Sequence, residues 1–401
     1  MKHPDELLDR LKWLVLNKEI GDLDVGLSAE EREPIPEKEI ILLQEKYRLL
    51  GEYLPQVLQA RRDLENDPYR KLWAALTALC FPTRTPVESG KLPVPESDGS
   101  LSGDIAPIFP LLAQVETAAE SYRAHGFSDE EIKKLLASFG GDLAVGERRT
   151  GQPGISKSYF RWLTNYATAS IFTVGGLIFN FRELPNYVVV LQHAETGKRE
   201  ILLKNRVFNA SGMPIESTGQ NLPQDAFSAA FAETEDAYYG HPVRGIRCVR
   251  ALTSYPKTEW SLAIKSGDPV LGVHIPKGAD ISVPAARRAF SEALTLIRER
   301  YPEKHIKALT CNSWLLDPAL DTLLPETSKI RAFASLFERF PNKSGGDAPF
   351  SFVFDRKMPP EEMPENTTLE RALKQYYLDG KFIYFFSGIY LPEDMPAVDR
   401  A

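Results

Sequence analysis

The pattern of hydrophobic and polar positions changes its period twice between residues 269 and 317. A short apolar run with β-branched residues, 270–275, is typical of a buried strand. After a loop with Pro and Gly, apolar residues recur at three- and four-residue spacing over 286–297, which predicts an amphipathic helix. A second apolar run, 306–310, predicts another strand. We therefore expect a right-handed βαβ unit, whose loop and helix N-terminus suit an anionic ligand.

The chain before this unit shows helical spacing of its apolar residues throughout 1–145. Ser128 followed three residues later by Glu131 predicts a capping box at the start of one of these helices. The polar segment 146–154 is rich in Gly and Pro, which predicts a domain boundary there. We expect a helical domain at 1–145 and a second domain at 155–395.

Strand-like runs dominate the second domain. Two hairpins are expected, one pairing 171–181 with 187–194 and the other pairing 260–265 with 270–275. The further expected elements are a strand at 199–203, a short helix at 226–240, a strand at 350–354, a helix at 367–378 and a closing strand at 381–386. The order predicts an α+β protein, in which an all-α domain precedes a mixed sheet flanked by helices.

Composition narrows the classes of function. The 48 basic and 55 acidic residues give a net charge of −7, which argues against a nucleic-acid partner. No run of about 18 apolar residues occurs, so we expect no membrane span. Three cysteines without metal-site or disulfide spacing indicate a reducing cytoplasm and no metal. The charged N-terminus predicts no secretory signal.

The segments HIPKG (274–278) and C-x-SWLLDP (311–318) resemble a bacterial family of acyltransferases that have an N-terminal helical N-acyltransferase domain and a GNAT-like C-terminal domain. GGLIFNF (175–181), SKIRAFASLF (328–337) and TTLERALKQYYLDG (367–380) are similar to further segments of this family. The usual GNAT pyrophosphate signature, Gln/Arg-x-x-Gly-x-Gly/Ala, is missing from this chain.

The resemblance implies a GNAT-like fold that binds acetyl-CoA or another acyl-CoA as co-substrate between two diverging parallel strands. The pantetheine would lie along 270–275, and the pyrophosphate would lie at the loop 276–282. The second strand would be 306–311. The residues that this arrangement assigns to the coenzyme are Val273, Ile275, Lys277, Gly278, Asn312 and Trp314.

Direct acyl transfer requires a group that takes a proton and donors that stabilise an oxyanion. His274 is a candidate base, and its alternative role is that of a hydrogen-bonded strand histidine. Ser313 either lines the site or holds a turn. Glu259 begins the strand before the key one, where acyltransferases of this fold can keep a base. Cys311 is either a nucleophile or a small buried filler, and Asp317 is expected to cap the next helix.

The leading hypothesis is a cytoplasmic, CoA-dependent N-acyltransferase that acts on a small-molecule or peptide amine. The alternative is a non-catalytic GNAT-like binding or regulatory protein, whose helical domain is a protein-interaction module. The missing pyrophosphate signature favours this alternative. A third hypothesis is a hydrolase that uses Ser313 or Cys311. The acceptor, the acyl chain length and the oligomeric state, a homodimer included, are left open by the sequence.

Overall fold

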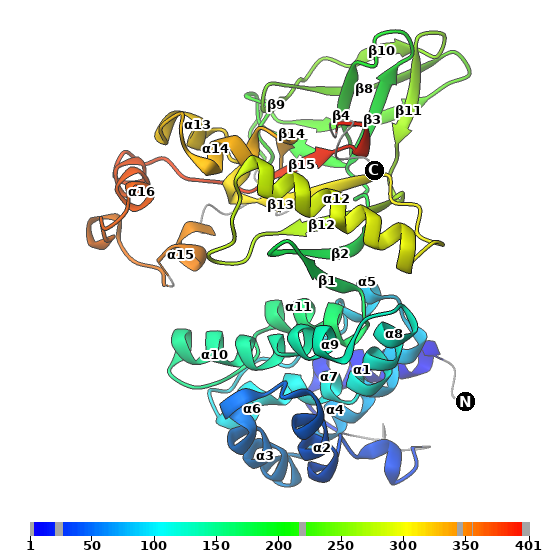
Figure 1. Ribbon diagram of the computed structural model, residues 1–401, viewed down its shortest axis with the longest axis vertical. Coiled ribbons are helices and arrows are strands. Elements are labelled where there is room, and N and C mark those ends of the chain that lie inside the picture. Colours follow the sequence, from blue (N-terminus) through cyan, green and yellow to red (C-terminus); the bar gives the residue numbers. More distant parts are fainter. Residues whose placement is uncertain (1–3, 21–26, 216–221, 343–347, 355, 395–401) are drawn as a thin grey trace. The chain divides into compact units, whose positions relative to one another are not determined.

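The computed structural model describes residues 4–20, 27–215, 222–342, 348–354 and 356–394 (Figure 1). The chain forms two compact units, Met1–Phe172 and Thr173–Ala401, and each is described here by itself. The segment 146–154, where the sequence placed a change of domain, lies inside the first unit and is helical up to Thr150.

The described part of the first unit is built from helices. They are α1 (Pro4–Asn17), α2 (Glu37–Tyr47), α3 (Leu54–Asp63), α4 (Pro68–Cys80), α5 (Pro86–Ser89), α6 (Leu101–Ile105), α7 (Phe109–Leu112), α8 (Val115–Ala124), α9 (Asp129–Leu136), α10 (Ser138–Thr150) and α11 (Lys157–Ala167). The predicted capping box at α9 is confirmed, because the Ser128 hydroxyl accepts from Glu131 N and the Glu131 carboxylate accepts from Ser128 N.

Two sheets make up most of the second unit. The first has the order β1 (Ile171–Val174), β2 (Leu177–Glu183), β12 (Pro269–His274), β13 (Ala308–Ser313), β15 (Phe386–Tyr390) and β14 (Glu338–Pro341). The second has the order β10 (Thr253–Pro256), β8 (Ala237–Arg244), β4 (Arg199–Leu203), β3 (Val188–His193) and β11 (Trp260–Ile264), with β7 (Phe231–Glu233) and β9 (Arg247–Cys248) also pairing with β8. A small ladder joins β5 (Arg206–Phe208) to β6 (Phe227–Ala229).

The predicted βαβ unit is confirmed. Strands β12 and β13 pair in parallel and are joined by helix α12 (Val283–Arg300), which lies along the first sheet (Figure 1). One face of this sheet packs against α12, where Phe290 meets Phe179 of β2 edge to face. The other face buries Val270 and Ala308 in an apolar cluster shared with the second sheet. The remaining helices of the described chain are α13 (Ala319–Leu323), α14 (Lys329–Ala334), α15 (Ala348–Phe352) and α16 (Thr368–Leu378).

Both expected hairpins are wrong. The run 171–181 turns back on itself at Gly175 and Gly176, whose positive φ values of 57° and 80° allow the tight β1–β2 turn. Strand β3 pairs with β4 and β11 in the second sheet, and β12 pairs with β2 instead of β11. Strands β2 and β3, and likewise β11 and β12, therefore belong to different sheets, because each strand pairs where its apolar face is buried.

Three further expectations are corrected. The segment 226–240, expected to be helical, forms β6, β7 and most of β8. Residues 350–354, expected to form a strand, belong largely to α15, where Phe350 packs edge to face on Tyr377 of α16. The closing strand starts at Phe386 instead of residue 381. In the described parts of the chain, none of the helices combines the length and the apolar character that a membrane crossing requires.

Candidate functional site

Strands β12 and β13 stop pairing with each other before either strand ends. Their last shared pair is Val273 with Cys311. Strand β12 continues to His274 along β2, and β13 continues to Ser313 along β15. Because each strand keeps its outer neighbour after losing the inner one, the two strands diverge at their carboxyl ends. Backbone groups on the inner edges there are available to an extended ligand that lies along one strand.

His274 is the last residue of β12 and lies on the sheet face that is turned away from α12. Its Nε2 is 3.0 Å from Asn180 Oδ1 of β2. An amide oxygen can only accept, so Nε2 carries the proton and Nδ1 carries the lone pair. Burial, with a smaller contribution from the charge of Arg182, lowers the pKa of His274 to about 4. The imidazole is therefore neutral at pH 7.

Four polar side chains from distant parts of the chain form a connected row on the same face. Asn342 Nδ2 donates to Asn312 Oδ1 at 2.8 Å and to Ser387 Oγ at 2.9 Å, and the Ser387 and Tyr187 hydroxyls are 3.3 Å apart. We call Asn312, Asn342, Ser387 and Tyr187 the polar row. Asn312 is exposed although it lies on a central strand, so this end of the sheet face is open to solvent.

The loop between β12 and α12 has a left-handed turn residue, Gly278, with φ of 84°. Asp280 accepts from Ser282 N at 3.0 Å and lies 3.0 Å from Lys329 Nζ of α14. The Ser282 amide and then Lys329 hold the pKa of Asp280 below its usual range. Its negative charge is thus compensated from within the chain. Lys277, one residue before Gly278, is exposed.

Several sequence-predicted residues lie on the other side of the sheet or outside it. The Ser313 hydroxyl accepts from Leu315 N at 3.1 Å, and strand alternation directs Ser313 away from the face of His274. Trp314 is buried in an apolar cluster that also contains Leu373 of α16. Asp317 was expected to cap the next helix; it lies one residue before Pro318, the N-cap of α13, and its carboxylate accepts from Ala319 N at 2.9 Å.

Cys311 and Val273 form the last parallel pair and both are buried. Burial raises the pKa of the Cys311 thiol to about 12. A thiol with such a pKa is protonated at neutral pH, so the site chemistry does not favour a cysteine nucleophile. Ile275 follows β12 and is half-buried.

The structural premise for Glu259 was wrong. Glu259 lies in the turn before β11, and β11 belongs to the second sheet and pairs with β3, so it is not the neighbour of β12. The Glu259 side chain is exposed and lies 3.9 Å from His193 Nε2. The structure brings His274 and Asn312 to the divergence of the two strands, with Lys277 and Gly278 in the adjoining loop. It does not bring Glu259 to the same face.

Sequence reasoning identified His274 and Asn312 but missed their hydrogen-bond partners. Asn180 lies in the middle of β2, and Asn342 directly follows β14. The one local signal is Gly272, because a Cβ at that position would collide with Asn180 Oδ1. A glycine within a central strand indicates that another group approaches the backbone closely.

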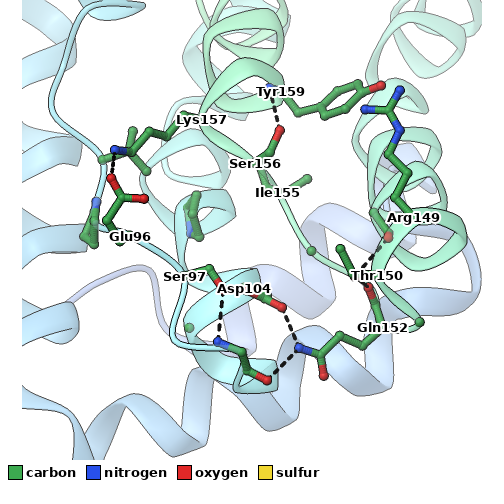
Figure 2. A pocket seen from close by; sticks show the side chains of 18 residues that line it. Glu96, Ser97, Asp104, Arg149, Thr150, Gln152, Ile155, Ser156, Lys157 and Tyr159 are labelled. Atoms are coloured by element: carbon green, nitrogen blue, oxygen red, sulfur yellow. Dashed lines mark hydrogen bonds and ion pairs between the residues drawn. The ribbon is translucent and has the colours of Figure 1, made fainter. Parts of the chain in front are cut away.

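The first unit has a cavity of its own, with a volume of about 590 Å³, between the segment preceding α6 and the α10–α11 connection (Figure 2). Glu96 pairs with Lys157, and Asp104 accepts from Ser97 and Gln152. Figure 2 shows these groups turned toward one another around the cavity. Because Glu96 and Asp104 already interact with donors that line the cavity, the cavity by itself indicates no particular ligand. The described residues also contain no group of three or more His, Cys, Asp or Glu that could hold a metal ion.

Comparison with known proteins agrees with this architecture. Two solved structures resemble the chain over nearly its whole length. One is an acyltransferase mutant in complex with octanoyl-CoA, with 18% sequence identity and a TM-score of 0.61. The other is an acyltransferase in complex with decanoyl-CoA and teicoplanin, with 19% sequence identity and a TM-score of 0.60. Each match covers 98% of this chain and 99% of the other. At these identities the likeness shows a shared fold. No curated protein sequence gives a significant match.

Family comparison covers nearly the whole described chain in two parts. Residues 38–169 match the N-acyltransferase N-terminal domain, and residues 171–390 match the GNAT-like C-terminal domain. The predicted family and the α+β architecture are both confirmed. The chain belongs to the acyltransferase family in which an N-acyltransferase N-terminal domain precedes a GNAT-like C-terminal domain.

Proposed function

We propose that this chain transfers an acyl group from acyl-CoA to an amine by direct attack within a ternary complex. The observation that carries the proposal is the divergence of β12 and β13 after the Val273–Cys311 pair. The family membership and the acyl-CoA complexes of proteins with the same fold support it.

The pantetheine would lie along the end of β12 and bond to the backbone of Val273 and Ile275 as an added strand would. Beyond Val273, β12 has lost its contact with β13, so its inner edge there can accept such a partner. Ser313 ends β13 and Trp314 follows it at the same divergence, and both would shape its exit by packing and turn formation.

The phosphates of the coenzyme would lie at the loop before α12. Lys277 and Gly278 belong to this loop, and Pro284 at the start of the helix leaves one fewer amide to satisfy. The repulsion between Asp280 and a bound phosphate would be reduced, because Lys329 Nζ lies 3.0 Å from the Asp280 carboxylate. Arg287 and Arg288, one turn further along, add positive charge to this end of the helix.

In the transfer step, the amine nitrogen attacks the thioester carbonyl carbon, and the new C–N bond leaves an oxyanion. Asn312 uses its Oδ1 to accept from Asn342, so its Nδ2 is the group that would donate to the oxyanion. Neutral His274 would take the ammonium proton after the C–N bond has formed. The C–S bond then breaks, and the departing thiolate takes up a proton to give free CoA and the amide.

The acceptor in this proposal is a small-molecule or peptide amine, and the reaction takes place in the cytoplasm. The three cysteines are buried and unpaired, which is compatible with a reducing compartment. One of the proteins of similar fold binds teicoplanin together with decanoyl-CoA. The proposal for this chain is restricted to the amine class.

Calorimetric titration with acetyl-, octanoyl- and decanoyl-CoA tests the first half of the proposal, and thiol release in the presence of amines tests the second. Saturable binding and amine-dependent release of CoA are expected. A correctly folded protein that binds none of the three coenzymes at millimolar concentration would contradict the proposal. Tight binding without turnover of any amine would favour the non-catalytic alternative, to which the missing pyrophosphate signature already points.

A further inference from the structure

The two sheets of the second unit enclose an apolar cluster whose edge becomes polar near the diverging strands. Val188 and Leu203 from the second sheet pack there with Val270 and Ala308 from the first. Tyr187 lies at this edge. Its ring packs beside Phe340, with the two centroids 6.4 Å apart, and its hydroxyl meets Ser387 of the polar row.

Arg206, the first residue of β5, covers the ring of Tyr187. The guanidinium carbon is 3.6 Å from the ring centroid, which is a close cation–π contact. Its Nη1 is buried and has no hydrogen-bond partner. Among the described residues, no carboxylate forms an ion pair with Arg206.

A second arginine shows how this chain satisfies a buried guanidinium elsewhere. Arg61, in α3, pairs with Glu33 and Glu65 and donates to the Ile35 carbonyl at 2.9 Å. Burial lowers the pKa of Arg206 and only the nearby Tyr187 opposes that change, yet a guanidinium stays charged at neutral pH. The Arg206 side chain as a whole is half-buried, but its Nη1 is a buried N–H donor without an acceptor, which is unfavourable and indicates that the partner of Nη1 arrives with a ligand.

The position of Arg206 identifies the source of that partner. Helix α12 covers one face of the first sheet, and the proposed phosphate loop belongs to that helix. Arg206 reaches the polar row on the opposite face, through Tyr187 and Ser387, and the exposed Asn312 belongs to the same row. An anion at Arg206 therefore lies on the side from which an amine would approach the thioester.

We infer that Arg206 binds a carboxylate of the acceptor, so that the substrate class is an amine that also carries a carboxylate. This inference rests on the proposed acyl transfer. One guanidinium balances one negative charge, which favours a carboxylate over a doubly charged phosphate. Arg206 is thus a specificity-determining residue. Tyr187 is a positioning residue, because the guanidinium of Arg206 packs on its ring.

The inference is tested with a series of ω-amino acids, from glycine to 6-aminohexanoate, each beside its carboxamide. The KM for each amine is measured at saturating octanoyl-CoA for the wild type, R206Q and R206K. We expect the acids to be preferred, and R206Q to raise the KM of the best acid at least tenfold. The KM of its carboxamide and the KM of octanoyl-CoA should stay unchanged. R206K should recover part of the loss, because it keeps the charge but loses the planar fork.

Arg250→Gln is the matched control, because Arg250 also stacks on an aromatic ring of this unit, that of Phe227, but has no link to the polar row. It should leave both KM values unchanged. Circular dichroism and thermal melting show whether each variant folds. If R206Q does not fold, R206K supplies the comparison.

Three outcomes of the kinetic series would overturn the inference. In the first, acids and carboxamides react equally well. In the second, R206Q raises the KM of octanoyl-CoA, which would assign Arg206 to a coenzyme phosphate. In the third, an aminoalkylphosphonate is preferred to the matching acid. Direct calorimetry of the acids against wild type and R206Q gives a readout without turnover. Carboxylate binding that is absent in the wild type, or equal in both proteins, also overturns it. The coenzyme titrations report separately on the proposed function.

Discussion

The imidazole Nε2 of His274 lies 3.0 Å from Asn180 Oδ1, and Gly272 is the residue that leaves room for this contact. The bond joins β12 to β2 on the face of the first sheet that is turned away from α12, and it sets the tautomer of the imidazole. The neutral ring is therefore oriented before any substrate is bound.

His274→Ala should lower kcat by roughly 10²-fold, the usual contribution of a positioned acid or base. The KM for acyl-CoA should change little, because the side chain lies beside the strand proposed to bind the pantetheine and not at the proposed phosphate loop. Because burial lowers the pKa of His274 to about 4, protonation removes the lone pair only below that pH. The wild-type rate should therefore show no loss between pH 7 and pH 5 that depends on His274.

Asn180→Ala is the companion variant for this test, since it keeps the imidazole but removes the partner of Nε2. A smaller decrease in kcat than that of His274→Ala is expected from thiol-release kinetics. Unchanged turnover in His274→Ala would assign the residue to strand structure alone.

Asp280→Asn should tighten acyl-CoA binding by about threefold at low salt, because it removes an exposed negative charge from the proposed phosphate loop. Lys329→Ala should have the opposite effect, since it leaves the charge of Asp280 without its ion pair. Calorimetry at two ionic strengths measures both changes. Acyl-pantetheine lacks the nucleotide phosphates and is the control ligand. A change of equal size for this ligand would place the phosphates elsewhere.

Cys311→Ala should retain kcat within about threefold and lose roughly 1–2 kcal/mol of stability through the small cavity it creates. Burial raises the pKa of this thiol to about 12, so the folded protein should be slow to react with thiol reagents at pH 8. Urea should make the thiol reactive. Rapid labelling of Cys311 in the native protein, together with loss of acyl transfer, would instead support the cysteine nucleophile.

Asp142 of α10 predicts a pH dependence of stability in the first unit. Its carboxyl is buried, its Oδ2 has no hydrogen-bond partner, and burial raises its pKa from 3.8 to about 7. The folded state therefore holds a proton that the unfolded state has lost between these pH values. The free energy of unfolding should fall as pH rises from 4 to 7, by at most about 1.4 kcal/mol per pH unit.

Asp142→Asn should remove this dependence, so it is expected to stabilise the protein at pH 8 and to change little at pH 4. Urea denaturation at the two pH values measures the difference. Asp9→Asn, at an exposed ion pair with Lys12, is the matched control. An equal effect of Asp142→Asn at both pH values would show that the carboxyl does not titrate as its burial predicts.

The βαβ unit and the helical character of the first unit could be predicted because both depend on patterns within about 20 residues. The spacing of apolar positions in α12 and the capping box at Ser128 both involve residues that are close together in the sequence. The hairpins could not be predicted in this way. Strand β12 prefers β2, which lies far back in the chain, over its neighbour β11, and no local pattern contains that preference.

The sequence by itself determined the class of the protein, the strand–helix–strand unit and the positions of His274 and Asn312 at the ends of its strands. These features follow from periodicity and from short motifs that local chemistry dictates. Only the tertiary structure decided how the polar row and Arg206 assemble around them. Tyr187, Asn342 and Ser387 are ordinary polar residues in the sequence. They come together because the two sheets bury an apolar cluster between them and leave these side chains at its edge, where each polar group needs a hydrogen-bond partner.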